Sequence, residues 1–120
     1  MIPSDGRQPA DCQAALRALA TQGKFLFGNH KLEKEFYDCD LLEVGERCEA
    51  IRISLREVLP GDREGPDPPY HVSYPPFPNL RLYAYCWKSA HFGERMYLKY
   101  ALTRGSPPEL VIYSFHRSRY

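Results

Sequence analysis

The second half of the chain alternates apolar side chains with polar or aromatic ones at every second residue, and this pattern constrains the fold more than any other. It runs through three consecutive segments, residues 80–87, 96–102 and 110–115. A period of two sends successive side chains to opposite faces of a β-strand. Because short connections join the segments, we predict an antiparallel sheet of three or four strands over residues 80–117.

The start of the chain shows helical spacing instead. After Asp11, apolar residues recur three and four positions apart until Gly23, so we predict a helix over 11–22 with Asp11 as its cap. Residues 24–27 are a short apolar run, which indicates either a strand or a packed connector. Residues 30–37 are expected to add one or two helical turns.

The strongest helical pattern lies over residues 40–59, where apolar residues recur every three or four positions. Asp40 with Glu43 resembles a capping box at its start, and Pro60-Gly61 is a stop signal. Because the helices come first and need an apolar surface to cover, we predict a single α+β domain over 1–120, with its N-terminal helices packed on one face of the sheet.

Proline dominates the segment between the last helix and the sheet. Residues 60–79 contain seven prolines and two glycines. Proline removes backbone donors and favours extended or polyproline conformations. We therefore predict a long loop over 60–79, and its aromatic residues indicate that part of it docks on a surface.

Basic residues concentrate where the sheet is predicted. The formal net charge is +1, yet residues 79–120 hold seven Lys or Arg against two Glu, whereas residues 1–78 hold nine against thirteen Asp or Glu. A basic sheet rich in aromatic residues suits an anionic partner such as RNA better than a neutral metabolite. The alternative is that these cations are only the solvated side of a hairpin.

Other classes of protein are disfavoured by simple features. No run approaches the ~18 to 20 apolar residues that cross a bilayer, and the first residues lack a basic stretch followed by an apolar core. We therefore expect no membrane partner and a cytoplasmic location. The four cysteines form no Cys-x-x-Cys pair, so we expect buried, reduced thiols and neither a metal nor a cofactor.

Candidate chemical groups gather at one rim of the predicted sheet. In a meander, the end of the first strand, the start of the second and the end of the third meet, which would bring together the candidate catalytic residues Lys88, Tyr97 and His116. Strict alternation opposes this grouping, because it places Ser114 and His116 on the side of the sheet opposite Tyr113 and Phe115. The predicted rim therefore requires the third strand to end or twist near Ser114. The candidate RNA-binding residues on these strands are Lys99, Arg95, Arg117, Arg119 and Trp87.

This set of groups matches the needs of RNA cleavage without a metal. A base takes the proton of a 2′-hydroxyl, an acid protonates the departing 5′-oxygen, and cations hold the phosphate. His116 suits either proton role, since histidine titrates near pH ~6.5, and Tyr97 can donate a hydrogen bond or a proton. Structural alternatives stay open for each of them: packing for Tyr97 and Trp87, a hydrogen-bonded surface position for His116, and solvation for the lysines.

A family resemblance points the same way. Met96-Tyr-Leu-Lys99, followed after a short turn by Leu110-Val-Ile-Tyr-Ser-Phe-His116, resembles the MqsR-like branch of the RelE superfamily, which are ribonuclease toxins of type II toxin-antitoxin modules. Trp87-Lys88 is similar to the Trp-Gln step of that family. The resemblance implies a RelE-like fold, Tyr97 and His116 as catalytic residues, Lys88 at the position of a polar catalytic group, and a cognate antitoxin protein as partner.

We therefore expect a metal-independent endoribonuclease toxin that cleaves mRNA. The alternative is a non-catalytic module that binds RNA or a protein through the same basic, aromatic sheet.

Overall fold

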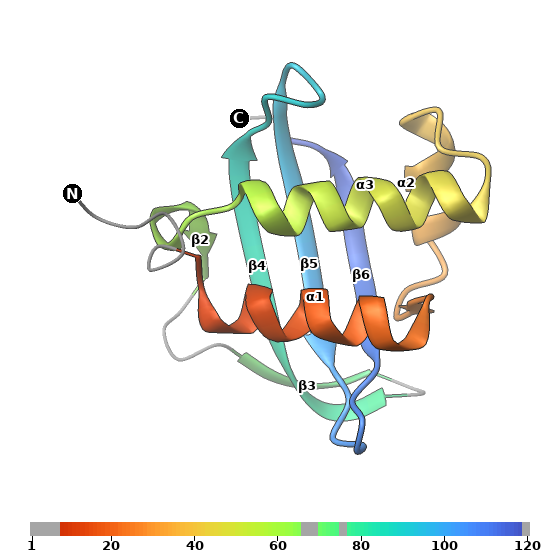
Figure 1. Cartoon of the computed structure of the whole chain (residues 1–120), viewed down its shortest axis with the longest axis vertical. Coiled ribbons are helices and arrows are strands. Elements are labelled where there is room, and N and C mark those ends of the chain that lie inside the picture. The colour runs from red at the N-terminus through yellow and green to blue at the C-terminus, as the bar shows by residue number, and fades with distance from the viewer. Residues whose placement is uncertain (1–7, 66–69, 75–76, 119–120) are drawn as a thin grey trace.

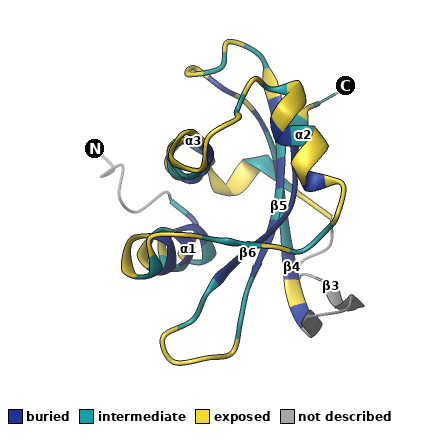
Figure 2. Cartoon of the chain, turned by 90° about the vertical axis from the view of Figure 1, so that its right-hand side faces the viewer, coloured by how far each residue is buried: buried dark blue, intermediate teal, exposed yellow. Residues whose placement is uncertain are grey.

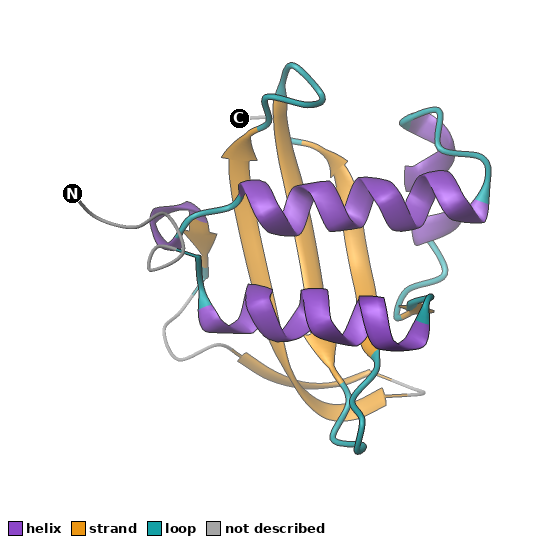
Figure 3. Ribbon diagram, in the orientation of Figure 1, coloured by secondary structure: helices purple, strands orange, loops and turns teal. Residues whose placement is uncertain are grey.

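Helices precede the long strands in the computed structural model, which describes residues 8–65, 70–74 and 77–118, with side chains over 8–65 and 80–118. The elements are α1 (Ala10–Gln22), β1 (Leu26–Phe27), α2 (Leu32–Asp38), α3 (Val44–Glu57), a 3₁₀ turn (Pro60–Asp62), β2 (Arg63–Glu64), β3 (Tyr70–Tyr74), β4 (Phe77–Lys88), β5 (Arg95–Leu102) and β6 (Leu110–Arg117). Figures 1 and 3 show α1 and α3 lying side by side across the strands. The predicted α+β class is confirmed.

The sheet is larger than predicted, and it is mixed. Its strand order is β1-β6-β5-β4-β2, and β3 pairs with β4 outside this path. The predicted meander is present as antiparallel β4, β5 and β6. However, β1 pairs with β6 in parallel, so the prediction of a purely antiparallel sheet of three or four strands is corrected. β1 and β2 have two residues each, and strands this short cannot be recognised from an alternating pattern.

The predicted loop over 60–79 is replaced in part by strands. β2 and β3 both fall within it, and β4 begins at Phe77 instead of Leu80. The prolines do not prevent this, because the segment 70–74 that forms β3 contains none. The segment thus contributes one edge of the sheet and a hairpin with β4.

The helices form where their spacing predicts them, with corrected ends. α1 begins at Ala10, and Gly23 ends it in the left-handed conformation at φ 69°. α3 is shorter than the predicted 40–59 and begins at Val44, because Glu43 is the cap: the Glu46 carboxylate accepts the Glu43 amide at 3.0 Å. Asp40 instead takes a positive φ of 61° in the preceding turn. No helix in the described ranges has the length and apolar content needed to cross a bilayer.

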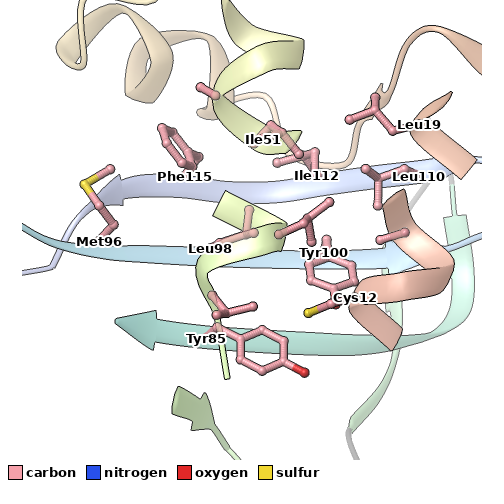
Figure 4. Close-up of a cluster of buried hydrophobic side chains, with 14 of the residues drawn as sticks. Cys12, Leu19, Ile51, Tyr85, Met96, Leu98, Tyr100, Leu110, Ile112 and Phe115 are labelled. Atoms are coloured by element: carbon pink, nitrogen blue, oxygen red, sulfur yellow. The ribbon is translucent and has the colours of Figure 1, made fainter. Parts of the chain in front are cut away.

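The main core lies between the sheet and the pair α1 and α3. Figure 2 shows both helices on the same side of the strands, and Figure 4 shows the side chains between them. These include Leu19, Ile51, Tyr85, Met96, Leu98, Tyr100, Leu110, Ile112 and Phe115, all of them buried. Cys12 is also buried here, whereas Cys39, Cys48 and Cys86 are half-buried, and all four thiols are free.

A buried polar network ties α1 to the sheet. The Asp11 carboxylate, with its side chain 8% exposed, accepts hydrogen bonds from the hydroxyls of Tyr85 at 2.7 Å and Tyr100 at 2.5 Å. It also accepts a hydrogen bond from the Arg63 guanidinium of β2 at 2.8 Å. Asp11 was expected as a helix cap, but no side-chain cap hydrogen bond is present at the start of α1. Its role is to hold α1, β2, β4 and β5 together.

A smaller apolar cluster lies on the other face of the sheet, which we call the distal face because it is turned away from α1 and α3. It contains Leu80, Leu82, Ala101, Val111 and Tyr113, with Leu26 against it. A Cβ atom on Gly28 would lie 2.6 Å from the Tyr113 ring, so that position leaves no space for a side chain. This cluster closes one end of the distal face and leaves the other end to the candidate site.

Candidate active site on the distal face

A β-bulge in β6 decides which side chains share the distal face. Lys99 is paired with Ser114, but the next residue, Tyr100, is paired with Ile112, so Tyr113 is the extra residue. One extra residue reverses the alternation of everything after it. Phe115 consequently enters the core, and His116 turns to the distal face. The strand was expected to end or twist near Ser114, whereas β6 continues to Arg117 and the bulge reverses its alternation.

Tyr97 and His116 are in direct contact on this face. They are cross-strand partners in β5 and β6, and their rings stack with centroids 5.1 Å apart and planes 24° apart. Both side chains are half-buried, so each is partly accessible to solvent. Two of the three predicted catalytic residues are therefore side by side.

The backbone fixes the hydrogen-bonding role of His116. Its Nδ1 atom lies 2.9 Å from the carbonyl oxygen of Arg117. A carbonyl oxygen only accepts, so Nδ1 carries the proton in this contact. In the neutral ring Nε2 then holds the free lone pair, and the imidazole presents a base to the distal face.

Tyr97 is suited to the opposite role. Burial raises the pKa of its phenol above the usual value of 10.0, and the neighbouring Glu64, Cys86 and Glu35 side chains raise it further. The hydroxyl therefore stays protonated at neutral pH, and it can donate a hydrogen bond or a proton.

Cations flank this pair along β5. Arg95 and Lys99 are each two residues from Tyr97 in the same strand, so they share its face. Lys88 is the cross-strand partner of Arg95, at the end of β4. Lys88 and Arg95 are exposed and Lys99 is half-buried, so the positive charge is available to an anion. The row is Lys88 and Arg95, then Tyr97 with His116, then Lys99.

The β4 side of the site is lined by small residues. Cys86 is paired with Tyr97, and Ala84 is paired with Lys99 on one side and with Glu64 of β2 on the other. The Arg95 guanidinium lies 3.6 Å from the Cys86 sulfur. The Cys86 and Ala84 side chains are both small, and Glu64 adds a negative charge on the β2 side of this face.

Two of the predicted RNA-binding residues lie elsewhere. Trp87 is 2% exposed on the helix side, where its indole donates to the Glu57 carboxylate at 2.8 Å, so it is a core residue and the prediction that it contacts RNA is corrected. Arg117 is paired with Met96 on the helix side, and it binds Glu94 at 2.5 Å and the Asp38 carbonyl at 3.1 Å. These contacts hold Arg117 away from the Tyr97 side. Arg119 lies outside the described residues.

Sequence reasoning missed two carboxylates near the pair. Glu35 of α2 accepts the Phe115 amide at 2.9 Å, beside His116, and Glu64 faces the distal side from β2. The local sequence pattern does not predict that either carboxylate lies at the site, because Glu35 belongs to a short amphipathic helix and Glu64 to a strand of only two residues. Only the tertiary arrangement brings them to the site.

The fold and the site together define an α+β protein whose basic sheet face carries a tyrosine–histidine pair. Comparison of the chain with known protein families, with curated proteins and with solved structures found no match. In the described part of the chain, no three His, Cys, Asp or Glu side chains are grouped closely enough to hold a metal ion. The function must therefore be inferred from the geometry of this site.

Proposed function

We propose that the protein is a metal-independent endoribonuclease that cleaves mRNA at the distal face, and that it acts as the toxin of a toxin-antitoxin module. The observation that carries the proposal is the stacked Tyr97–His116 pair, with a base edge and a protonated phenol side by side among Lys88, Arg95 and Lys99. The resemblance of residues 96–99 and 110–116 to MqsR-like toxins supports the same reading.

The geometry supports one assignment of roles. Nε2 of His116 takes the proton of a ribose 2′-hydroxyl, and the 2′-oxygen forms a bond to phosphorus. The bond from phosphorus to the 5′-oxygen breaks, and the Tyr97 hydroxyl gives its proton to that oxygen. The products are a 2′,3′-cyclic phosphate and a free 5′-hydroxyl, after which the His116 proton returns Tyr97 to its neutral form through solvent.

The cations stabilise the charge that this reaction creates. Negative charge grows on the non-bridging phosphate oxygens as the 2′-oxygen attacks, and ammonium or guanidinium groups favour that state over the starting one. Lys99 and Arg95 are suited to this task by their positions on either side of Tyr97 in β5. Lys88 adds charge at the end of β4, where the RNA backbone would enter or leave.

The test is cleavage of a synthetic RNA by the purified protein. We expect His116→Ala and Tyr97→Phe each to lower the rate by about 10² to 10⁴-fold, the usual contribution of a positioned acid or base. Cleavage should persist in EDTA, leave a 2′,3′-cyclic phosphate, and fail on an RNA with 2′-deoxyribose at the cleaved position. His30→Ala and Tyr37→Phe are matched controls, because both residues are exposed and should leave the rate unchanged.

A wild-type protein that binds RNA but leaves it intact would refute the nuclease and favour the binding-module alternative. In that case, Lys99→Ala should weaken binding and reduce its salt dependence, while Tyr97→Phe should have little effect. The antitoxin partner is tested separately by controlled expression with and without the adjacent open reading frame. Growth arrest that disappears on co-expression supports it, and arrest that persists contradicts it.

A further inference from the structure

Helix α2 holds β6 on both sides of His116. The Glu35 carboxylate accepts the backbone amide of Phe115 at 2.9 Å, and the Arg117 guanidinium donates to the backbone carbonyl of Asp38 at 3.1 Å. Phe115 and Arg117 are the two neighbours of His116. The histidine is therefore attached at both ends to one helix, and it is not itself part of either contact.

Among the described residues, β5 is the only strand that pairs with this part of β6. β1 pairs with β6 only at Val111 and Ile112, and the bulge at Tyr113 then interrupts the regular register with β5. A backbone amide in such a position needs another acceptor. At Phe115 the Glu35 carboxylate supplies it, in the place that a strand would otherwise occupy.

Side-chain packing strengthens the same connection. Phe36, the residue after Glu35, lies against the ring of Phe115, with centroids 5.7 Å apart, and both rings are buried. Adjacent residues of α2 thus hold the backbone and the side chain of Phe115. The Arg117 carbonyl, which accepts the His116 Nδ1 proton, belongs to the next residue that α2 holds.

We propose that Glu35 is a positioning residue for His116: by holding the Phe115 amide it fixes the strand beyond the bulge, and so the direction and tautomer of the imidazole. This inference rests on the proposed function for its effect on catalysis. The hydrogen bond that Glu35 makes is to the backbone amide of Phe115, so its effect on the imidazole passes through that backbone.

Three variants distinguish the effect of the Glu35 hydrogen bond on His116 from the effect of its charge and from general changes in α2. Glu35→Ala removes the acceptor, whereas Glu35→Gln keeps an acceptor oxygen at the same reach and loses only the charge. Glu33→Ala is the matched control, because it removes a carboxylate of α2 whose hydrogen bonds go to Arg47 of α3. Circular dichroism and thermal melting establish which variants are folded.

Two readouts are measured, and one does not depend on activity. The first is the RNA cleavage rate, for which we expect a loss of about 10 to 100-fold in Glu35→Ala, the scale of a misplaced catalytic group, and less than about threefold in Glu35→Gln and Glu33→Ala. The second is the ring nitrogen spectrum of His116 in ¹⁵N-histidine protein, assigned with His116→Ala. We expect the neutral ring to be the Nδ1–H tautomer in wild type and Glu35→Gln, and a tautomer mixture in Glu35→Ala.

The outcomes decide the inference independently of the nuclease. If neither the wild-type protein nor any variant cleaves RNA, the proposed function fails. A tautomer mixture that is found only in Glu35→Ala would still support the positioning role. A folded Glu35→Ala that keeps the wild-type tautomer and the wild-type rate overturns the inference, even if His116→Ala is inactive. Should Glu35→Ala not fold, Glu35→Gln becomes the deciding variant: because it keeps the acceptor oxygen, a tautomer mixture in the folded Glu35→Gln overturns the inference.

Discussion

Replacing Asp11 by alanine should cost the protein a large part of its stability. The carboxylate accepts three hydrogen bonds, from Tyr85, Tyr100 and Arg63, and it is almost fully buried. The variant removes all three while the donors stay in place. A buried donor that loses its acceptor costs more than the net value of the bond, because it also lost its water on folding.

The size of this stability loss depends on the hydrogen bonds that each donor still makes without Asp11. Tyr85 still accepts from Arg63 at 3.0 Å, and Tyr100 still lies 3.2 Å from the Cys12 sulfur, so neither hydroxyl is wholly unpaired. The Arg63 side chain is 23% exposed, so water can solvate it in part. Breaking a buried charge pair costs about 3 to 5 kcal/mol, and these remaining contacts place Asp11→Ala in the lower half of that range, about 3 to 4 kcal/mol. The total free energy of unfolding of a domain of this size is about 5 to 15 kcal/mol.

Urea unfolding followed by the fluorescence of Trp87, the single tryptophan, measures this loss. Tyr100→Phe and the double variant complete a thermodynamic cycle, in which the two changes should be clearly non-additive because the residues share a hydrogen bond. Glu49→Ala is the control: it breaks an exposed ion pair with Arg52 and should hardly move the urea midpoint. A loss below about 1.5 kcal/mol in Asp11→Ala, or strict additivity in the cycle, would refute the reasoning.

Three further predictions concern other parts of the molecule. Gly28→Ala should destabilise the fold by about 1 to 3 kcal/mol in the same urea assay, because the new methyl group overlaps the Tyr113 ring. Tyr113→Leu in the same chain should restore part of the lost stability. An unchanged urea midpoint in Gly28→Ala alone would contradict the close contact. Stability should fall as pH rises above 9, because burial raises the pKa of Cys12 from 9.0 to about 12 and that of Tyr100 far above 10.0, so the unfolded chain loses these protons first; a urea midpoint that stays level up to pH 11 would disagree. Lys99→Ala should reduce RNA affinity and flatten its dependence on salt, as measured by fluorescence anisotropy, and an unchanged slope would remove Lys99 from the interface.

Much of the fold could be predicted because its signals are local. The apolar spacing of α1 and the alternation in β4, β5 and β6 depend only on neighbours in the chain. The predicted start of α3 is wrong because Asp40 has a side chain that is typical of an N-cap, whereas Glu43, which caps the helix, does not. The structure decides between them through backbone conformation, since Asp40 has a positive φ and Glu43 is extended.

The candidate site was harder to predict, because one residue of register decides it. Tyr97 and His116 are predicted as candidates from residue type, strand order and the family resemblance, but their shared face depends on the bulge at Tyr113, which has no sequence signature in a strand of ordinary composition. Trp87 was misassigned for a related reason. Alternation says which residues share a face without saying which face the helices cover, and only the assembled core makes that choice.

The position of α2 beside β6 has a consequence for self-association. Strand edges with unpaired amides and carbonyls are templates on which a second chain can add a strand, and proteins guard against this by covering them. Beyond Ile112, β6 has no pairing to β1, and there Glu35 occupies the Phe115 amide. By this contact α2 withholds the Phe115 amide from the strand of a second chain, so this part of the β6 edge offers one backbone donor fewer for edge-to-edge association.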